Sequence, residues 1–200
     1  MTTLLHEERL GAVLDAVRAC RPRSVADLGC GRGDLLVRLA TLPGVARVTG
    51  LDTARDALEA LRARLAALPP GGAEVTLVAG AIAEAGSALA GHDCATLVEV
   101  IEHVAPAELP ALERAVFARM RPARVVVTTP NAEFNPLLGV PTSRRRHPGH
   151  RFEWPRRRFR DWTGTLARRH GYHAACRDIA GCHPDLGGAS QMAVFDRDDA

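Results

Sequence analysis

Lysine is missing from the 200-residue sequence, because every one of the 26 residues counted as lysine or arginine is arginine. A P-loop nucleotide-binding site needs a lysine against the phosphates, and a Schiff-base enzyme needs a lysine amine, so both classes are excluded. Aromatic residues are scarce at 4%, and no run of about 18 apolar residues occurs. We therefore expect neither a membrane-spanning segment nor a membrane partner.

Cysteine is also sparse, and the five cysteines include no pair with C-x-x-C spacing. An odd number without paired spacing argues against a disulfide framework and a thiolate zinc site, and it favours a reducing compartment. Residues 1–17 lack the basic segment and apolar core of a signal peptide. We therefore expect a cytoplasmic protein.

The remaining composition is typical of a folded globular chain, with 46% hydrophobic residues, 24% charged residues and a net charge of +3. The length lies below the roughly 250–300 residues at which a single hydrophobic core stops growing. We expect one domain over residues 1–200. Apolar residues spaced three and four apart predict an N-terminal helix within residues 1–22.

Short apolar segments alternate with helical segments along the rest of the chain. This alternation predicts an α/β fold, a mostly parallel sheet with helices on both faces. Residues 129–155 are rich in Pro, Gly, Arg and His without a clear period, so we expect a long functional loop there. The predicted helices cover 34–42, 54–68, 109–120 and 156–170, and the predicted strands cover 24–28, 45–51, 74–78, 94–98, 124–128, 172–179 and 190–195.

A glycine-rich segment, Asp27-Leu-Gly-Cys-Gly-Arg-Gly33, joins the first predicted strand to a helix. Glycines there allow a sharp turn and the close approach of a ligand to the backbone. Asp52 ends the next strand, where it could accept hydrogen bonds from both hydroxyls of an adenosine ribose. The spacing differs from the G-x-G-x-x-G of dinucleotide sites, and the carboxylate of Asp27 suits a ligand with an amino group better than a pyrophosphate.

The segment from Val25 to Gly33, taken with Gly50-Leu-Asp52, resembles the first two motifs of class I S-adenosylmethionine-dependent methyltransferases. The resemblance implies a Rossmann-like, mostly parallel sheet of seven strands and S-adenosylmethionine as the cofactor. The alternative is a structural glycine turn in another α/β domain. The cofactor contacts that the resemblance implies are Asp27, Gly29, Gly31 and Asp52.

Two glutamates and a histidine follow the fourth predicted strand, in Glu99-Val-Ile-Glu-His103. The spacing of Glu99, Glu102 and His103 places them on one side of a helical turn, at the sheet edge where α/β proteins bind ligands. Two close carboxylates repel unless a cation or proton lies between them. Oxygen and nitrogen donors together favour Mn²⁺, Fe²⁺, Co²⁺ or Zn²⁺ over Mg²⁺. The alternative is a solvated helix start.

Two further segments, Thr128-Thr-Pro-Asn-Ala-Glu-Phe-Asn135 and Arg146-His-Pro-Gly-His-Arg-Phe-Glu-Trp154, extend the likeness over nearly the whole chain. Together with residues 99–103 they resemble the HEN-type 2′-O-methyltransferases of the RNA 3′-terminal ribose. The chain departs from that family at Gly149, where Asp is frequent, and at Pro155, where Thr is frequent. The resemblance implies a divalent ion (Mn²⁺, Co²⁺ or Mg²⁺) on Glu99, Glu102, His103 and His150, with His147 as the alternative to His150.

The function implied by the resemblance is methyl transfer from S-adenosylmethionine to the 2′-hydroxyl at an RNA 3′ end. A metal bound to the 2′- and 3′-oxygens would explain end specificity and would lower the pKa of the attacking hydroxyl. His103 and His150 would act through the metal, and His147 is a candidate to take the proton. The expected partners are the RNA 3′ end and an RNA-repair partner protein that delivers it.

Arginines surround His150 in the sequence, at 144–146, 151, 156–158 and 160. They produce a local positive field that could bind phosphates, and Phe152 or Trp154 could stack on a terminal base. The alternative is a solvated helix face. Two other functions stay open: a metal-dependent small-molecule O-methyltransferase of the catechol or quinone type, and a non-catalytic RNA-end-binding protein.

Overall fold

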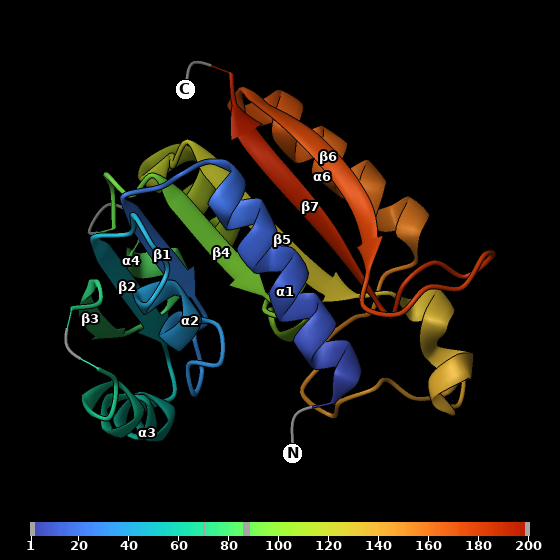
Figure 1. Cartoon of the computed structure of the whole chain (residues 1–200). Coiled ribbons are helices and arrows are strands. Elements are labelled where there is room, and N and C mark those ends of the chain that lie inside the picture. The colour runs from blue at the N-terminus through green and yellow to red at the C-terminus, as the bar shows by residue number, and fades with distance from the viewer. Residues whose placement is uncertain (1–2, 70, 86–88, 199–200) are drawn as a thin grey trace.

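A seven-stranded sheet forms the centre of the computed structural model, which describes residues 3–69, 71–85 and 89–198 (Figure 1). The strand order is β3-β2-β1-β4-β5-β7-β6, and only β7 runs antiparallel to its neighbours. This confirms the predicted fold class. The strands are β1 (Ser24–Leu28), β2 (Arg47–Asp52), β3 (Glu74–Ala79), β4 (Cys94–Val98), β5 (Arg124–Pro130), β6 (Tyr172–Ile179) and β7 (Ser190–Arg197).

Helices cover both faces of the sheet, and each face has its own apolar cluster. Leu10 of α1, Leu36 of α2 and Leu58 of α3 belong to one cluster. Phe117 and Phe159, from η2 and α6, belong to the other, and α1 and α6 lie on opposite sides of the sheet (Figure 1). The helical elements are α1 (Leu4–Ala19), α2 (Leu36–Ala40), α3 (Arg55–Ala66), α4 (Ile82–Ala85), η1 (Ile101–His103), α5 (Leu109–Glu113), η2 (Arg114–Met120), η3 (Ala132–Leu138) and α6 (Arg156–His170).

The central strands β1, β4 and β5 are buried along most of their length because both faces of the sheet are covered. In β5, Val125 and Val127 pack into the α6 cluster, whereas Val126 between them packs into the α1 cluster. Successive side chains of a strand point to opposite faces, so all three are buried. None of the helices within the described ranges is long and apolar enough to cross a membrane.

The structure corrects the sequence prediction at two places. The expected helix 109–120 is α-helical only to Glu113 and continues as a π-helix, η2. The expected uninterrupted loop 129–155 is wrong at its start, since β5 extends to Pro130 and the 3₁₀-helix η3 follows. Asn131 explains this start, because its side chain accepts a hydrogen bond from the Glu133 amide at 3.0 Å and so caps η3.

The parallel strands bring their carboxyl ends to one edge of the sheet. The glycine loop follows β1 there, Asp52 ends β2, and Glu99–His103 follow β4. Because the strand order reverses between β1 and β4, a crevice opens at this edge, as in other open α/β sheets. The predicted cofactor and metal residues therefore belong to neighbouring strand ends.

Candidate active site

The glycine loop fits tightly against its surroundings. Gly29 and Gly33 have φ angles of +80° and +83°, in the left-handed region that glycine adopts without a steric penalty. A Cβ atom at Gly29 would lie 2.6 Å from Val100, and one at Gly33 would lie 2.2 Å from Leu61. Both positions therefore require glycine, for conformation and for space.

Asp52 is fixed by the backbone around the loop. Its Oδ2 atom accepts a hydrogen bond from the Gly31 amide at 2.7 Å, and its Oδ1 atom accepts one from the Ala54 amide at 2.8 Å. The carboxylate stays partly exposed and borders a cleft of about 810 Å³. Each carboxylate oxygen retains a lone pair for a ligand hydroxyl.

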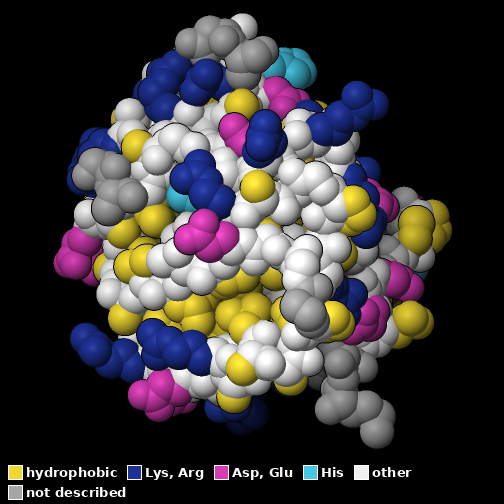
Figure 2. Space-filling view, turned by 60° about the vertical axis from the view of Figure 1, so that its left-hand side comes forward, with side chains coloured by type: hydrophobic (Ala, Val, Ile, Leu, Met, Phe, Trp, Pro, Cys, Tyr) yellow, Lys and Arg dark blue, Asp and Glu magenta, His cyan; other side chains and the backbone are white. Residues whose placement is uncertain are grey.

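The cleft runs from the glycine loop to two of the predicted metal residues, Glu99 and His103. Its volume is in the range of small-molecule and cofactor sites. Figure 2 shows the side of the molecule that carries β3 and α4, where apolar side chains gather in a hollow and basic side chains are spread around it. The cleft wall includes Gly29, Asp52, Ile82, Glu99, Val100 and His103.

Asp27 is buried at the end of β1, with 2% of its surface exposed. Thr96 Oγ1 donates a hydrogen bond to its Oδ1 atom at 2.8 Å, and its Oδ2 atom has no partner among the described residues. Burial, with the nearby charge of Asp52, raises the pKa of Asp27 to about 7. A contact between Asp27 and a cofactor amino group stays a prediction.

Glu99 stands in a strained backbone conformation, with a φ angle of +55° that is uncommon outside glycine. Thr128 Oγ1 donates to its Oε1 atom at 2.9 Å, and Arg9 of α1 donates to its Oε2 atom at 3.0 Å. These bonds hold the carboxylate at the cleft wall. Sequence analysis missed Arg9, which lies 90 positions from Glu99.

Glu102 is completely buried and only half satisfied. Thr129 Oγ1 donates to its Oε2 atom at 3.1 Å, while Oε1 finds no hydrogen-bond partner within the described ranges. Burial, together with the charge of Glu99, raises the pKa of Glu102 well above its usual value. A buried carboxylate oxygen without a partner is unfavourable, and a cation placed there would remove the deficit.

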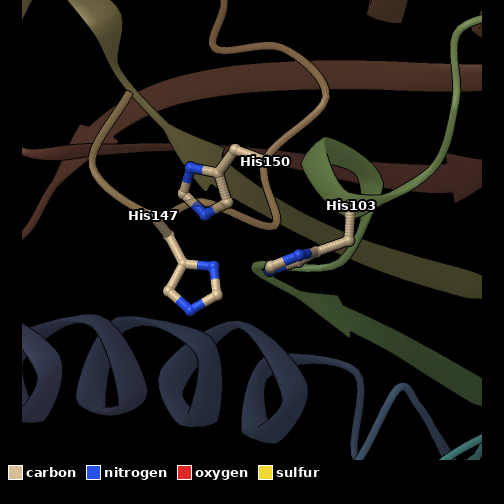
Figure 3. A group of neighbouring side chains, drawn as sticks. All are labelled: His103, His147 and His150. Carbon is tan, nitrogen blue, oxygen red and sulfur yellow. The ribbon is translucent and has the colours of Figure 1, made fainter. Parts of the chain in front are cut away.

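Three imidazole rings, those of His103, His147 and His150, lie next to one another (Figure 3). His103 comes from η1, and His147 and His150 come from the loop before α6. One nitrogen of each ring lies within 4.8 Å of the other two, an arrangement that could hold a metal ion. The structure therefore brings His103 and His150 together as predicted and adds His147, while the two glutamates lie outside this three-residue group.

His150 is buried and hydrogen-bonded to Glu153, with 2.6 Å between His150 Nδ1 and Glu153 Oε1. Burial would raise the pKa of Glu153, but hydrogen bonds from Asn135 and His150 hold it below the usual range. An ionised Glu153 accepts a hydrogen bond from Nδ1–H of His150, which leaves the Nε2 atom of His150 to face a metal. Gly149 has no side chain that could hydrogen-bond to His150, as an Asp at that position could. Glu153 provides the carboxylate partner of His150 instead.

Gly149 suits the histidine group because a side chain there would crowd two of its members. A Cβ atom would lie 3.0 Å from His147 Nδ1 and 3.1 Å from His103 Nδ1. His103 also forms a hydrogen bond with the backbone of Gly149. Glycine in place of the frequent Asp at position 149 therefore leaves room for the rings of His103 and His147.

Arg146 was expected, with Arg144 and Arg145, to face a phosphate, but the structure places its side chain inside the loop. Its guanidinium donates to Asn135 Oδ1 at 2.5 Å, to the carbonyl of Ala189 at 2.6 Å and to the carbonyl of Asn131. These bonds attach the loop to η3 and to the chain before β7, so Arg146 is structural. Arg144 and Arg145 remain exposed.

The two aromatic residues that follow His150 differ in exposure: Phe152 is buried and Trp154 is half-buried. Phe152 is buried in the core and stacks on Trp154 with 4.2 Å between ring centroids, so the expectation that Phe152 could stack on a base is wrong. Trp154 is half-buried, and the Arg158 guanidinium lies 5.6 Å from its ring centre. Phe159 and Trp162 pack in the core, as predicted.

Comparison with known proteins agrees with this site. A family model described as a methyltransferase domain matches residues 25–123. The crystal structure of the methyltransferase domain of bacterial CtHen1 superposes with a TM-score of 0.84, at 33% identity, covering 96% of this chain and 99% of that one. The chain belongs to the Hen1 methyltransferase family. This identification confirms the class I methyltransferase fold and S-adenosylmethionine as the cofactor.

Longer relatives contain the Hen1 domain as one part. The small RNA 2′-O-methyltransferase of Gallus gallus is 36% identical over 206 residues, which cover 97% of this chain and 54% of that protein. The chain thus spans about half the length of the curated relatives it matches. The structure of the Pnkp1/Rnl/Hen1 RNA repair complex shares the fold, with a TM-score of 0.71 at 18% identity over 98% of this chain and 42% of that one.

Proposed function

We propose that this chain transfers a methyl group from S-adenosylmethionine to the 2′-hydroxyl of the 3′-terminal ribose of an RNA, and that a divalent ion takes part. One observation carries the proposal: Glu99 and His103 line the same cleft as Gly29 and Asp52. A methyl donor bound at the glycine loop would therefore lie next to groups that suit a metal. Proximity of this kind supplies much of the acceleration in group transfer.

The residues present fit a metal ion. Glu102 offers a buried oxygen that has no partner in the part of the chain the structure describes, and His150 offers its Nε2 atom. Glu99 and His103 complete the set of proposed ligands, and oxygen with nitrogen donors suits Mn²⁺ or Co²⁺ better than Mg²⁺. When bound, such an ion supplies Lewis acidity that lowers the pKa of a coordinated hydroxyl and orients vicinal oxygens.

The chain's own residues prepare the site in three ways. Thr128 and Arg9 hold Glu99, and Thr129 holds Glu102, so both carboxylates are oriented before substrate arrives. Glu153 keeps the proton of His150 on Nδ1. Such preorganisation means that little rearrangement is needed when the substrate binds.

RNA is the proposed substrate because its end carries a vicinal diol and phosphates. Exposed arginines precede His147 and His150 in the sequence or follow them closely, at 144, 145, 151, 157, 158 and 160, and supply positive charge to this part of the chain. The curated relatives are named small RNA 2′-O-methyltransferases, which supports the same substrate class. We also propose a cytoplasmic location and an RNA-repair partner, the latter supported by the name of the Pnkp1/Rnl/Hen1 complex.

A methyl-transfer assay with labelled S-adenosylmethionine separates the possible functions. We expect label on an RNA with an intact 3′-terminal diol and none on the same RNA after periodate oxidation. Label on catechol but not on RNA would show a small-molecule methyltransferase instead. RNA binding without transfer to either substrate would show a non-catalytic end-binding protein.

A further inference from the structure

His147 is held with a defined ring orientation at the surface of the histidine group. The amide of Gly149 donates a hydrogen bond to His147 Nδ1 at 3.0 Å, and the amide of His150 donates to the His147 carbonyl at 3.1 Å. These two bonds close a tight turn that includes Pro148. The ring is exposed to solvent.

The bond from Gly149 determines where the ring proton of His147 lies. Because Nδ1 accepts a hydrogen bond, its lone pair is occupied and it carries no proton. The proton of the imidazole must then be on Nε2. As long as this turn persists, Nε2 of His147 is a hydrogen-bond donor and has no lone pair for a metal or for a proton.

His150 has the opposite arrangement, three residues further along. Its Nδ1 atom donates to Glu153 at 2.6 Å, so its Nε2 atom has the free lone pair. The ring centroids of His147 and His150 are 5.4 Å apart, and that of His103 lies 5.5 Å from His147. A group that reaches the Nε2 of His150 therefore also lies close to His147, which offers it a donor.

We propose that His147 is a substrate-binding residue that donates its Nε2 proton to an oxygen of the RNA's terminal nucleotide, and is neither a metal ligand nor a proton acceptor. This rests on the proposed function, because that function places the terminal ribose at the neighbouring ligands. The ribose hydroxyls and the 5′-phosphate at this end of the nucleotide carry oxygen atoms that can accept a hydrogen bond from an N–H donor. The proposal replaces the two roles considered for His147 from the sequence.

Two variants of the full chain test this role. His147→Phe keeps a ring but removes the donor, whereas His147→Gln restores an N–H donor on a side chain of similar reach. For a short RNA with a 3′ diol, we expect KM to rise about tenfold or less in His147→Phe, the scale of one hydrogen bond, and to return toward wild type in His147→Gln. An unchanged KM in His147→Phe would overturn the proposal.

Metal affinity provides the second readout and does not depend on activity. Calorimetry with Mn²⁺ or Co²⁺ alone should give the same affinity for both His147 variants as for wild type, while His150→Ala should weaken it. A tenfold loss of Co²⁺ affinity in His147→Phe would show that His147 is a ligand. An RNA with a neutral methylphosphonate at its last linkage tells whether the acceptor is phosphate or ribose, since only a phosphate acceptor would lose the His147 effect.

Nitrogen NMR of the full chain reads the proton positions directly. We expect long-range ¹H–¹⁵N spectra to show His147 protonated on Nε2 and His150 protonated on Nδ1. The opposite assignment for His147 would overturn the proposal. If wild type fails to methylate RNA but these spectra and metal affinities are as expected, the proposed function fails while the geometry of His147 stands.

Discussion

The raised pKa of Asp27 makes the free energy of unfolding depend on pH. Burial raises its pKa from 3.8 to about 7, so the folded chain keeps a proton that the unfolded chain releases between these values. The stabilising contribution of the protonated form is complete below about pH 4 and is lost as pH rises through about 7. In urea unfolding, we expect wild type to lose more stability than Asp27→Asn between pH 5 and 7.5, by roughly 1.4 kcal/mol for each pH unit up to about pH 7.

The control for this experiment is an acid at an exposed surface position. Asp56→Asn, at an exposed position of α3, should follow the wild-type profile. If Asp27→Asn and wild type show the same slope, Asp27 is ionised throughout this pH window. Its burial would then be offset by a group other than Thr96.

Glu153 is the residue on which the proposed metal ligand His150 depends most. Glu153→Gln keeps the size of the side chain but removes the charge that holds the His150 proton on Nδ1. Loss of such a supporting carboxylate typically weakens metal binding by about 10–100-fold, and we expect that range for Mn²⁺ measured by calorimetry. S-adenosylmethionine affinity should be unchanged, because the glycine loop lies elsewhere.

A matched variant for this test is Glu133→Gln in η3. Glu133 forms an ion pair with Arg156 at 2.8 Å, whereas Glu153 is hydrogen-bonded to His150. Metal affinity should stay at the wild-type value in Glu133→Gln. Equal losses in both glutamine variants would indicate a general loosening of the loop and not a specific support of His150.

Individual site residues differed in how far the sequence could predict them. The order of Glu99, Glu102 and His103 after β4 predicted that they lie at one sheet edge, but the helical turn covers only Ile101–His103, and Glu99 precedes it with a φ angle of +55°. His150 depended on family resemblance, since no local pattern links it to His103. Arg9 was missed because only tertiary folding brings α1 to β4, whereas Glu153 could have been found from its i, i+3 spacing to His150.

At the level of elements, the loop before α6 contains arginines of two kinds. Arg146 makes three internal hydrogen bonds, so Arg146→Ala should destabilise the fold by roughly 3 kcal/mol, at about 1 kcal/mol for each bond. Arg144 and Arg145 are exposed, with one hydrogen bond from Arg145 to the His150 carbonyl at 3.2 Å, and replacing both with Ala should cost about 1 kcal/mol or less. Differential scanning calorimetry distinguishes the two outcomes.

The exposed pair should instead affect RNA binding. If Arg144 and Arg145 each neutralise a phosphate, the double alanine variant should reduce the slope of log K against log salt by about 1.4–1.8. Fluorescence anisotropy with a short RNA at several salt concentrations measures this slope. An unchanged slope would leave these arginines as a solvated surface without an RNA contact.

Strands were easier to predict than the connections between them. Strands β1, β2 and β4 are buried on both faces over most of their length and end beside a glycine or an acidic residue, so the sequence marks their limits within one or two residues. The 3₁₀-helix η3 could not be predicted in the same way, because its sequence has no apolar period. It depends on the Asn131 cap and on Arg146, which contacts Asn131 and Asn135 from a later segment.

For the whole molecule, the sheet topology determines where the site lies, and the net charge of +3 does not. The reversal of strand order between β1 and β4 places the cofactor loop and the carboxylate–histidine group at one crevice. The alternation of apolar and helical segments in the sequence was sufficient to predict this edge. The closing contacts of α1 and of the loop before α6 were not predictable, because they join residues that are far apart in the chain.

The central claim is that this crevice methylates an RNA end through a metal-held diol. The most direct measurement is transfer of labelled methyl from S-adenosylmethionine to three RNAs that differ only at the 3′ end: a 2′,3′-diol, a 3′-deoxy end and a 3′-phosphate, each with Mn²⁺ or with EDTA. We predict that only the diol RNA with Mn²⁺ is labelled efficiently, at its terminal 2′-oxygen. Equal labelling of the 3′-deoxy RNA, or full labelling in EDTA, would contradict the account.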